Sequence, residues 1–154
     1  MPNWGYSFNS YEKDSMAKAS GRELRISQKA AREICRHIRH MGLNQAKAFL
    51  ERVVTKEQAV PYRRHRKEVS HKAGLQGWYA GRYPVKAAQQ VINILNDLEA
   101  NAEAKGLDTE RLRIIHAAAY KGRILKRFFP RAFGRSSPNS EILCHLEFVA
   151  EETG

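Results

Sequence analysis

Residues 111–135 read RLRIIHAAAYKGRILKRFFPRAFGR and hold eight Lys or Arg residues and no Asp or Glu. The two flanks are acidic. Residues 87–110 hold five carboxylates and one Lys, and residues 136–154 hold four Glu and no Lys or Arg. A segment with charges of one sign repels itself unless a polyanion lies along it. The contrast therefore predicts that this segment binds a polyanion.

Apolar and polar residues alternate on both sides of the basic stretch, which is the pattern of β-strands. In residues 112–120 the alternation predicts one shared face for Leu112, Ile114, His116, Ala118 and Tyr120. In residues 141–150 the corresponding face would hold Ile142, Cys144, Leu146 and Phe148. Turn-forming residues close the stretch between them, at Gly134, Pro138 and Asn139. We therefore expect an antiparallel hairpin over residues 111–150, with its tip at about residues 125–138.

This hairpin is too long to lie within the body of the protein. Each arm has about 20 residues at about 3.3 Å each, so it extends up to about 65 Å. A chain of 154 residues folds to a radius of gyration of about 15 Å. The distal part must therefore project, and because an isolated two-stranded ribbon is marginal in water, we expect a partner to order it.

Helical periodicity marks the region before the hairpin. Residues 22–26 alternate like a short strand, and Ser27 stands where a helix N-cap is expected. Apolar spacing then predicts a helix from residue 29 that Gly42 ends, and a second helix capped by Asn44. Pro84 fits the first turn of a third helix of about 20 residues, which Gly106 would end.

The length and composition indicate one domain. A chain of 154 residues with 42% apolar content supports a single core. Residues 1–16 are polar and are expected to form a tail that is poorly ordered or ordered by a partner. Residues 17–154 would then form the domain, interrupted by a basic, aperiodic insert at residues 59–83. An insert of this length without periodicity is usually functional or ordered by a partner.

The net charge of +11 and the isoelectric point near 10.0 favour a nucleic acid as partner over an anionic membrane. No apolar run approaches the roughly 18 residues of a spanning helix, and the N-terminal region has no signal-peptide pattern. We therefore expect a cytoplasmic protein. Cys35 and Cys144 are isolated in apolar positions, which predicts buried free thiols.

The sequence shows no clear pattern of a catalytic or metal-binding site. His37 and His40 lie three residues apart without further ligands, and His65 and His71 lie in the basic insert, where contacts to phosphates or bases are expected. No glycine-rich phosphate loop and no paired acid and base are present. The C-terminal carboxylates are expected in solvent or facing a protein; they are Glu141, Glu147, Glu151 and Glu152. We expect no enzyme, no metal and no cofactor.

Three basic segments coincide with irregular or projecting backbone: residues 29–39, 62–72 and 121–135. Aromatic residues interleave with two of these segments, as in RNA-binding surfaces. The candidate RNA contacts are Lys29, Arg32, Arg36, Arg39, Arg63, Arg64, His65, Arg66, Lys67, His71, Lys72, Trp78, Arg82, Lys121, Arg123, Lys126 and Arg127. The phenylalanines at the charged tip cannot belong to the core of their own domain, so we expect them to stack on bases or fill a crevice; they are Phe128, Phe129 and Phe133.

The tip sequence Pro130-Arg131-Ala132-Phe133-Gly134-Arg135 resembles the Pro-Arg-Ala-x-Gly-Arg tip of the universal large-subunit ribosomal protein L-twenty-two family. Further motifs resemble the archaeal and eukaryotic branch of that family: Val60-Pro61-Tyr62, Gly77-Trp78, Gly81-Arg82-Tyr83-Pro84 and Asn101-Ala102-Glu103. The resemblance covers about residues 17–150. Phe128-Phe129 departs from it, because many relatives have a more basic run there.

The resemblance implies an α+β fold, with a small antiparallel three-stranded sheet packed on about three helices and a long projecting β-hairpin. It implies a structural, non-enzymatic constituent of the large ribosomal subunit that binds large-subunit rRNA and aids assembly. The tip would line the peptide exit tunnel through Phe128, Phe129, Pro130, Arg131, Ala132, Phe133, Gly134 and Arg135. The implied partners are rRNA, neighbouring large-subunit proteins and the passing nascent peptide, with the chain ribosome-bound in the cytoplasm.

Two other readings stay open from the residues alone. The first is an RNA-binding protein or RNA chaperone outside the ribosome, because composition alone does not distinguish such a protein from a ribosomal one. The second is a nuclease that acts through His65 and His71. High-salt sedimentation with large subunits separates the first reading from a ribosomal protein, and cleavage of naked RNA tests the second.

Overall fold

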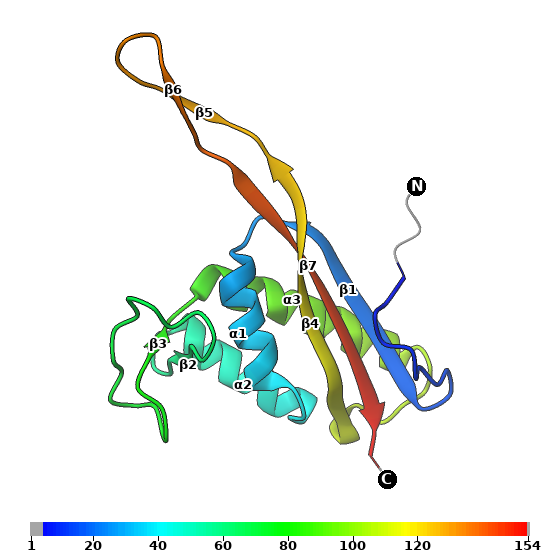
Figure 1. Cartoon of the computed structure of the whole chain (residues 1–154). Coiled ribbons are helices and arrows are strands. Elements are labelled where there is room, and N and C mark those ends of the chain that lie inside the picture. The colour runs from blue at the N-terminus through cyan, green and yellow to red at the C-terminus, as the bar shows by residue number, and fades with distance from the viewer. Residues whose placement is uncertain (1–4, 154) are drawn as a thin grey trace.

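The computed structural model describes residues 5–153 and shows an α+β fold from which a long β-hairpin projects (Figure 1). The elements in chain order are β1 (Met16–Leu24), α1 (Gln28–Ile38), α2 (Leu43–Val54), β2 (Val60–Pro61), β3 (Gly81–Arg82), α3 (Val85–Glu103), the 3₁₀ helix η1 (Thr109–Arg111), β4 (Leu112–Leu125), β5 (Phe128–Pro130), β6 (Ser136–Pro138) and β7 (Glu141–Glu152). This confirms the expected fold class, with three helices beside a three-stranded antiparallel sheet.

The main sheet has the strand order β1-β7-β4, and both pairings are antiparallel. Strand β7 is central and covered on both faces, so residues 143–150 are all buried. One face packs on the helices, where Leu146 and Phe148 join Ile34 of α1 and Leu95 of α3 in the core. Burial of these side chains, each worth about 1.5–3 kcal/mol, holds the base of the hairpin to the body.

The helix boundaries follow the sequence signals only in part. Ser27 caps α1, and its hydroxyl accepts a hydrogen bond from the N–H of Ala30 at 3.5 Å. The prediction that α1 continues to Gly42 was wrong, because the N–H of His40 donates to the carbonyl of Ile114 at 2.7 Å. Residues 39–42 therefore run along the edge of β4. Asn44 lies inside α2, whose N-cap is Gly42.

The third helix also starts one residue later than predicted. Pro84 is its N-cap rather than a residue of its first turn. The helix ends at Glu103, and Gly106 adopts a φ of +76° just beyond it, a conformation that glycine adopts at little cost.

A β-bulge corrects the predicted face of β4. The register passes from Ile114 opposite Ala150 to His116 opposite Val149, so Ile115 is an extra residue on this strand. Beyond the bulge Ala117 turns into the core, with an exposed fraction of 0%. His116 and Tyr120 consequently lie on the opposite face from Leu112 and Ile114, although simple alternation had placed all four together.

Strand β1 is longer than the strand predicted over residues 22–26 and begins earlier, at Met16. Its pairing with β7 shifts between Gly21 and Leu24, which disrupts the simple alternation. Helix α3 crosses it closely, since a Cβ atom added at Gly21 would lie 2.5 Å from Cδ1 of Ile94. A side chain at this position would therefore require the side chain of Ile94 to shift.

Part of the predicted N-terminal tail packs on the sheet. Residues 1–4 lie outside the described residues, but the N–H and the hydroxyl of Ser7 donate to Oε2 of Glu147 at 3.2 and 3.0 Å. Phe8 lies against the ring of His116, with 5.4 Å between the ring centroids. The expectation that Glu147 faces solvent or another protein was wrong, because this segment of the same chain covers it and its exposed fraction is 3%.

Candidate nucleic-acid interface

The projecting ribbon carries exposed cations that the body does not neutralise in full. Lys121, Arg123, Lys126 and Arg127 are all exposed. Glu141 contacts the ribbon at Arg127 Nη2, 4.0 Å away, and forms a closer pair with Arg25, whose Nη2 lies 2.7 Å from it. The hydrogen bond from Arg25 holds the pKa of the Glu141 carboxyl below its usual range. Most of the positive charge of the ribbon therefore faces solvent.

The hairpin tip is a small two-stranded ladder of β5 and β6 closed by residues 131–135. The N–H of Arg131 donates to the carbonyl of Arg135 at 2.8 Å, and the chain turns through Phe133 and Gly134 at φ values of 56° and 64°. A positive φ is uncommon for a residue with a bulky side chain. Strain of this kind is often found where a protein binds a ligand.

The three phenylalanines of the tip lie outside any core. Their exposed fractions are 64% for Phe128, 51% for Phe129 and 98% for Phe133. The guanidinium of Arg131 folds back on the ribbon, where its Nε donates to Oγ of Ser137 at 3.0 Å and its carbon lies 6.0 Å from the Phe129 ring centroid. Apolar rings that are exposed on a projecting tip indicate that a binding partner covers them.

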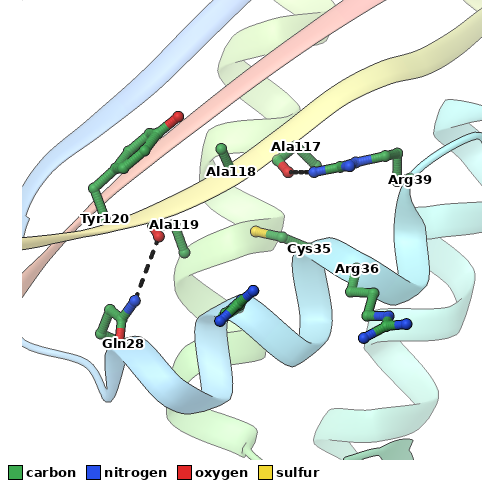
Figure 2. A pocket seen from close by; sticks show the side chains of 9 residues that line it. Gln28, Cys35, Arg36, Arg39, Ala117, Ala118, Ala119 and Tyr120 are labelled. Atoms are coloured by element: carbon green, nitrogen blue, oxygen red, sulfur yellow. Dashed lines mark hydrogen bonds between the residues drawn. The ribbon is translucent and has the colours of Figure 1, made fainter. Parts of the chain in front are cut away.

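A groove of about 560 Å³ runs between α1 and β4 (Figure 2). Two α1-side residues bond the carbonyls of the strand edge: Gln28 donates to Ala119 at 3.5 Å and Arg39 donates to Ala117 at 2.7 Å. Cys35 points from α1 toward β4 in Figure 2, and its burial raises the pKa of the thiol. Arg32 and Arg36 also line the groove, so the basic stripe of α1 forms one wall of it.

A buried carboxylate holds the basic insert in place. Glu33 of α1 accepts hydrogen bonds from the backbone N–H groups of Arg63, Arg64 and His65, each at 3.0 Å. Burial alone would raise the pKa of this carboxyl, but the three hydrogen bonds outweigh it and, together with the charge of His65, keep the pKa below its usual value. The insert is therefore fixed to α1 by one ionised side chain.

Trp78 is engaged within the insert itself. Its indole N–H donates to the carbonyl of Tyr62 at 2.9 Å. The guanidinium carbon of Arg63 lies 4.9 Å from the indole centroid, and the ring of Tyr79 stacks on it at 4.8 Å. His71 contacts the Tyr79 ring edge-on at 5.0 Å. These contacts give Trp78, His71 and Arg63 a packing role within the insert. Their contact with RNA stays a prediction.

The structure brings two of the three predicted segments together. Lys29 of α1 lines one cavity with residues 64–67 of the insert, and Arg36 lines another with Arg63. The hairpin tip stands away from both (Figure 1). Sequence reasoning missed Glu33, although a signal was present: this carboxylate lies next to Ile34 within the apolar stripe of α1.

Residues 5–153 contain neither a metal-binding cluster nor a membrane-spanning helix. Among these described residues, His, Cys, Asp and Glu side chains form no group of three that could hold a metal ion. None of the helices in the same range has the length and apolarity required to cross a membrane.

Comparison with known proteins identifies the family. The family model described as ribosomal protein L22p/L17e matches residues 19–151. The protein is 53% identical to large ribosomal subunit protein uL22 of Methanopyrus kandleri, over 97% of this chain and 96% of the relative. It is 50% identical to the uL22 protein of Archaeoglobus fulgidus (98% and 97% covered) and 49% identical to that of Cenarchaeum symbiosum (99% of each). The resemblance seen in the sequence is confirmed, including its archaeal character, and the nuclease alternative loses its support. The chain therefore belongs to the ribosomal protein L22p/L17e family of structural ribosomal proteins.

Proposed function

We propose that this chain is a structural constituent of the large ribosomal subunit that bridges segments of rRNA and lines the peptide exit tunnel with its hairpin tip. The observation that carries the proposal is the projecting ribbon, whose cations and phenylalanines are exposed and lie outside the core. Family membership supports the ribosomal setting. The partners would be large-subunit rRNA, neighbouring ribosomal proteins and the nascent peptide.

The energetics of the ribbon favour a permanent polyanionic site. An isolated two-stranded ribbon is marginally stable in water, and the like charges of Lys126 and Arg127 at its distal end destabilise it further. Phosphates of rRNA would neutralise these charges and release counterions. A permanent site also explains why the ribbon is long, since its tip must reach past the outer RNA layer.

The tip combines groups that suit unpaired RNA and close approach. Exposed phenylalanine rings stack on bases, which are often unstacked in folded RNA. Ala132 and Gly134 are small, so the backbone there can approach rRNA closely and leave space in a channel. No step of this mechanism is catalytic: the protein acts by holding RNA segments and shaping a passage.

UV crosslinking in cells, with both the RNA and the crosslinked residues mapped, tests the proposal. We expect crosslinks from residues 128–135 to large-subunit rRNA at the tunnel, and the loss of the crosslink at residue 133 in a Phe133→Gly variant. Glycine adopts a φ of 56° readily, so this change removes the ring and keeps the turn. Crosslinks spread over many mRNAs, with little rRNA, would instead identify an RNA chaperone outside the ribosome.

A further inference from the structure

A cavity of about 540 Å³ lies between the start of α1, the insert and the start of α3. Its walls hold five cationic side chains and no carboxylate: Lys29, Arg64, Arg66, Lys67 and Arg82. These residues come from three separate parts of the chain. Gathering so many like charges around one space is unfavourable unless an anion enters it.

The same cavity offers more than charge. Tyr62, Tyr83 and His65 also line it. Within the part of the chain that the structure describes, His65 Nε2 is the one buried side-chain polar atom without a hydrogen-bond partner. A buried polar atom left unpaired costs free energy, so such an atom requires an explanation. A bare anion does not need aromatic walls, whereas a nucleobase uses both rings and a hydrogen-bonding group.

The walls are already fixed without a ligand. Glu33 holds the backbone from residue 63 to residue 65, and the N–H of Tyr62 donates to the carbonyl of Ala80 at 2.9 Å. Arg82 is placed over the Tyr62 ring, with 5.9 Å from its guanidinium carbon to the ring centroid. A site built in advance loses less entropy on binding. Its volume lies within the range of about 300–1,000 Å³ that is typical of small-ligand sites, and it is too small for a duplex.

We propose that this cavity receives one unpaired RNA nucleotide, whose phosphate lies among the cations. Its base hydrogen-bonds to His65 once the imidazole turns Nε2, which is buried in the free protein, toward the cavity. The proposal rests on the proposed function only for the RNA that supplies the nucleotide. It gives the insert a defined task, which is to capture a single base extruded from the surrounding RNA.

The test is a titration of the full-length protein with the four 5′-nucleoside monophosphates, followed by NMR of the histidine ring nitrogens. We expect at least one nucleotide to shift the His65 signal saturably and to bind at least about 5-fold more tightly than inorganic phosphate. His65→Phe keeps a ring but lacks the nitrogen. It should lower the affinity for that nucleotide by roughly 3- to 10-fold, which is the net effect of one hydrogen bond. His65→Gln, which retains a polar group at the end of the side chain, should restore part of the affinity.

His37→Phe is the matched control, because His37 packs on the ring of Phe49 and lies outside the lining of the cavity. It should leave nucleotide binding unchanged. Equal affinity for phosphate and nucleotides, or an unchanged affinity in His65→Phe, would overturn the proposal and leave an anion site only. The titration does not depend on the ribosome, so its failure and the failure of rRNA crosslinking are separate results.

In large subunits that carry the chain, chemical probing of rRNA bases provides a second readout. The proposal expects one base to become reactive when His65→Phe replaces the native chain, and the same base to stay protected with His37→Phe. An identical reactivity pattern with all three proteins would contradict a role for the cavity in the assembled particle.

Discussion

Replacement of Glu33 tests how the basic insert is held. Its carboxylate accepts three backbone hydrogen bonds at 3.0 Å, and its exposed fraction is 1%. Glu33→Ala removes the acceptor and leaves the N–H groups of Arg63, Arg64 and His65 without a partner. At about 1–1.5 kcal/mol for each bond, the free energy of unfolding should fall by about 3–4 kcal/mol.

Glu33→Gln is the milder change. The amide keeps the shape of the side chain but has one acceptor oxygen and no charge, so we expect a loss of about 2 kcal/mol. The effect also depends on pH. Because the pKa of Glu33 is lower in the folded protein than its ordinary value, its contribution is complete above about pH 4.3 and is lost as the pH falls through the folded pKa. The alanine variant should lack this part of the acid dependence.

Urea denaturation gives the free energy of unfolding, and amide hydrogen exchange reports on the insert directly. Exchange of the N–H groups of residues 63–65 should accelerate in both variants, and more in Glu33→Ala. Glu99→Gln is the control, since Glu99 pairs with Lys47 at a partly exposed site and should cost less than about 1 kcal/mol. The reasoning is refuted if Glu33→Ala unfolds within about 0.5 kcal/mol of the native protein and its amides at 63–65 stay equally protected.

Three further changes probe the tip, the core and the ribbon. Gly134→Val places a β-branched residue at a φ of +64°, which should impair incorporation into large subunits while urea denaturation of the free protein changes by less than about 1 kcal/mol; equal losses in both assays would contradict this. Phe148→Ala empties a fully buried site and should lower the free energy of unfolding by about 3–5 kcal/mol, a value that a loss below about 1 kcal/mol would disprove. Exchanging Lys126 and Arg127 together for Gln should reduce the slope of log affinity for rRNA against log salt by about 1–2, measured by filter binding, and an unchanged slope would show that neither residue contacts phosphate.

The sequence predicted those features that depend on local periodicity and charge. The apolar stripe of α1 and the Ser27 cap are local, and both are found in the structure. The projecting hairpin followed from its length, and the exposure of Phe133 followed from its place in a charged tip. Family motifs supplied the strand count of the sheet.

Features that arise from contacts between distant segments were not predictable in this way. The bulge at Ile115 depends on where β7 pairs and on the bond between the Ile114 N–H and the carbonyl of Met41. The burial of Glu147 depends on a segment 140 residues away in sequence, which reaches it through Ser7. The cavity around His65 combines parts of α1, the insert and α3, so neither its shape nor its unpaired nitrogen can be read from one segment.

The most direct test of the central claim is a cryo-EM structure of large ribosomal subunits that contain this chain. We predict that residues 121–139 lie embedded in rRNA and that the turn at residues 131–135 forms part of the tunnel wall. A map in which the body is bound but the hairpin lies over the outer surface of the particle, away from the tunnel, would contradict this account.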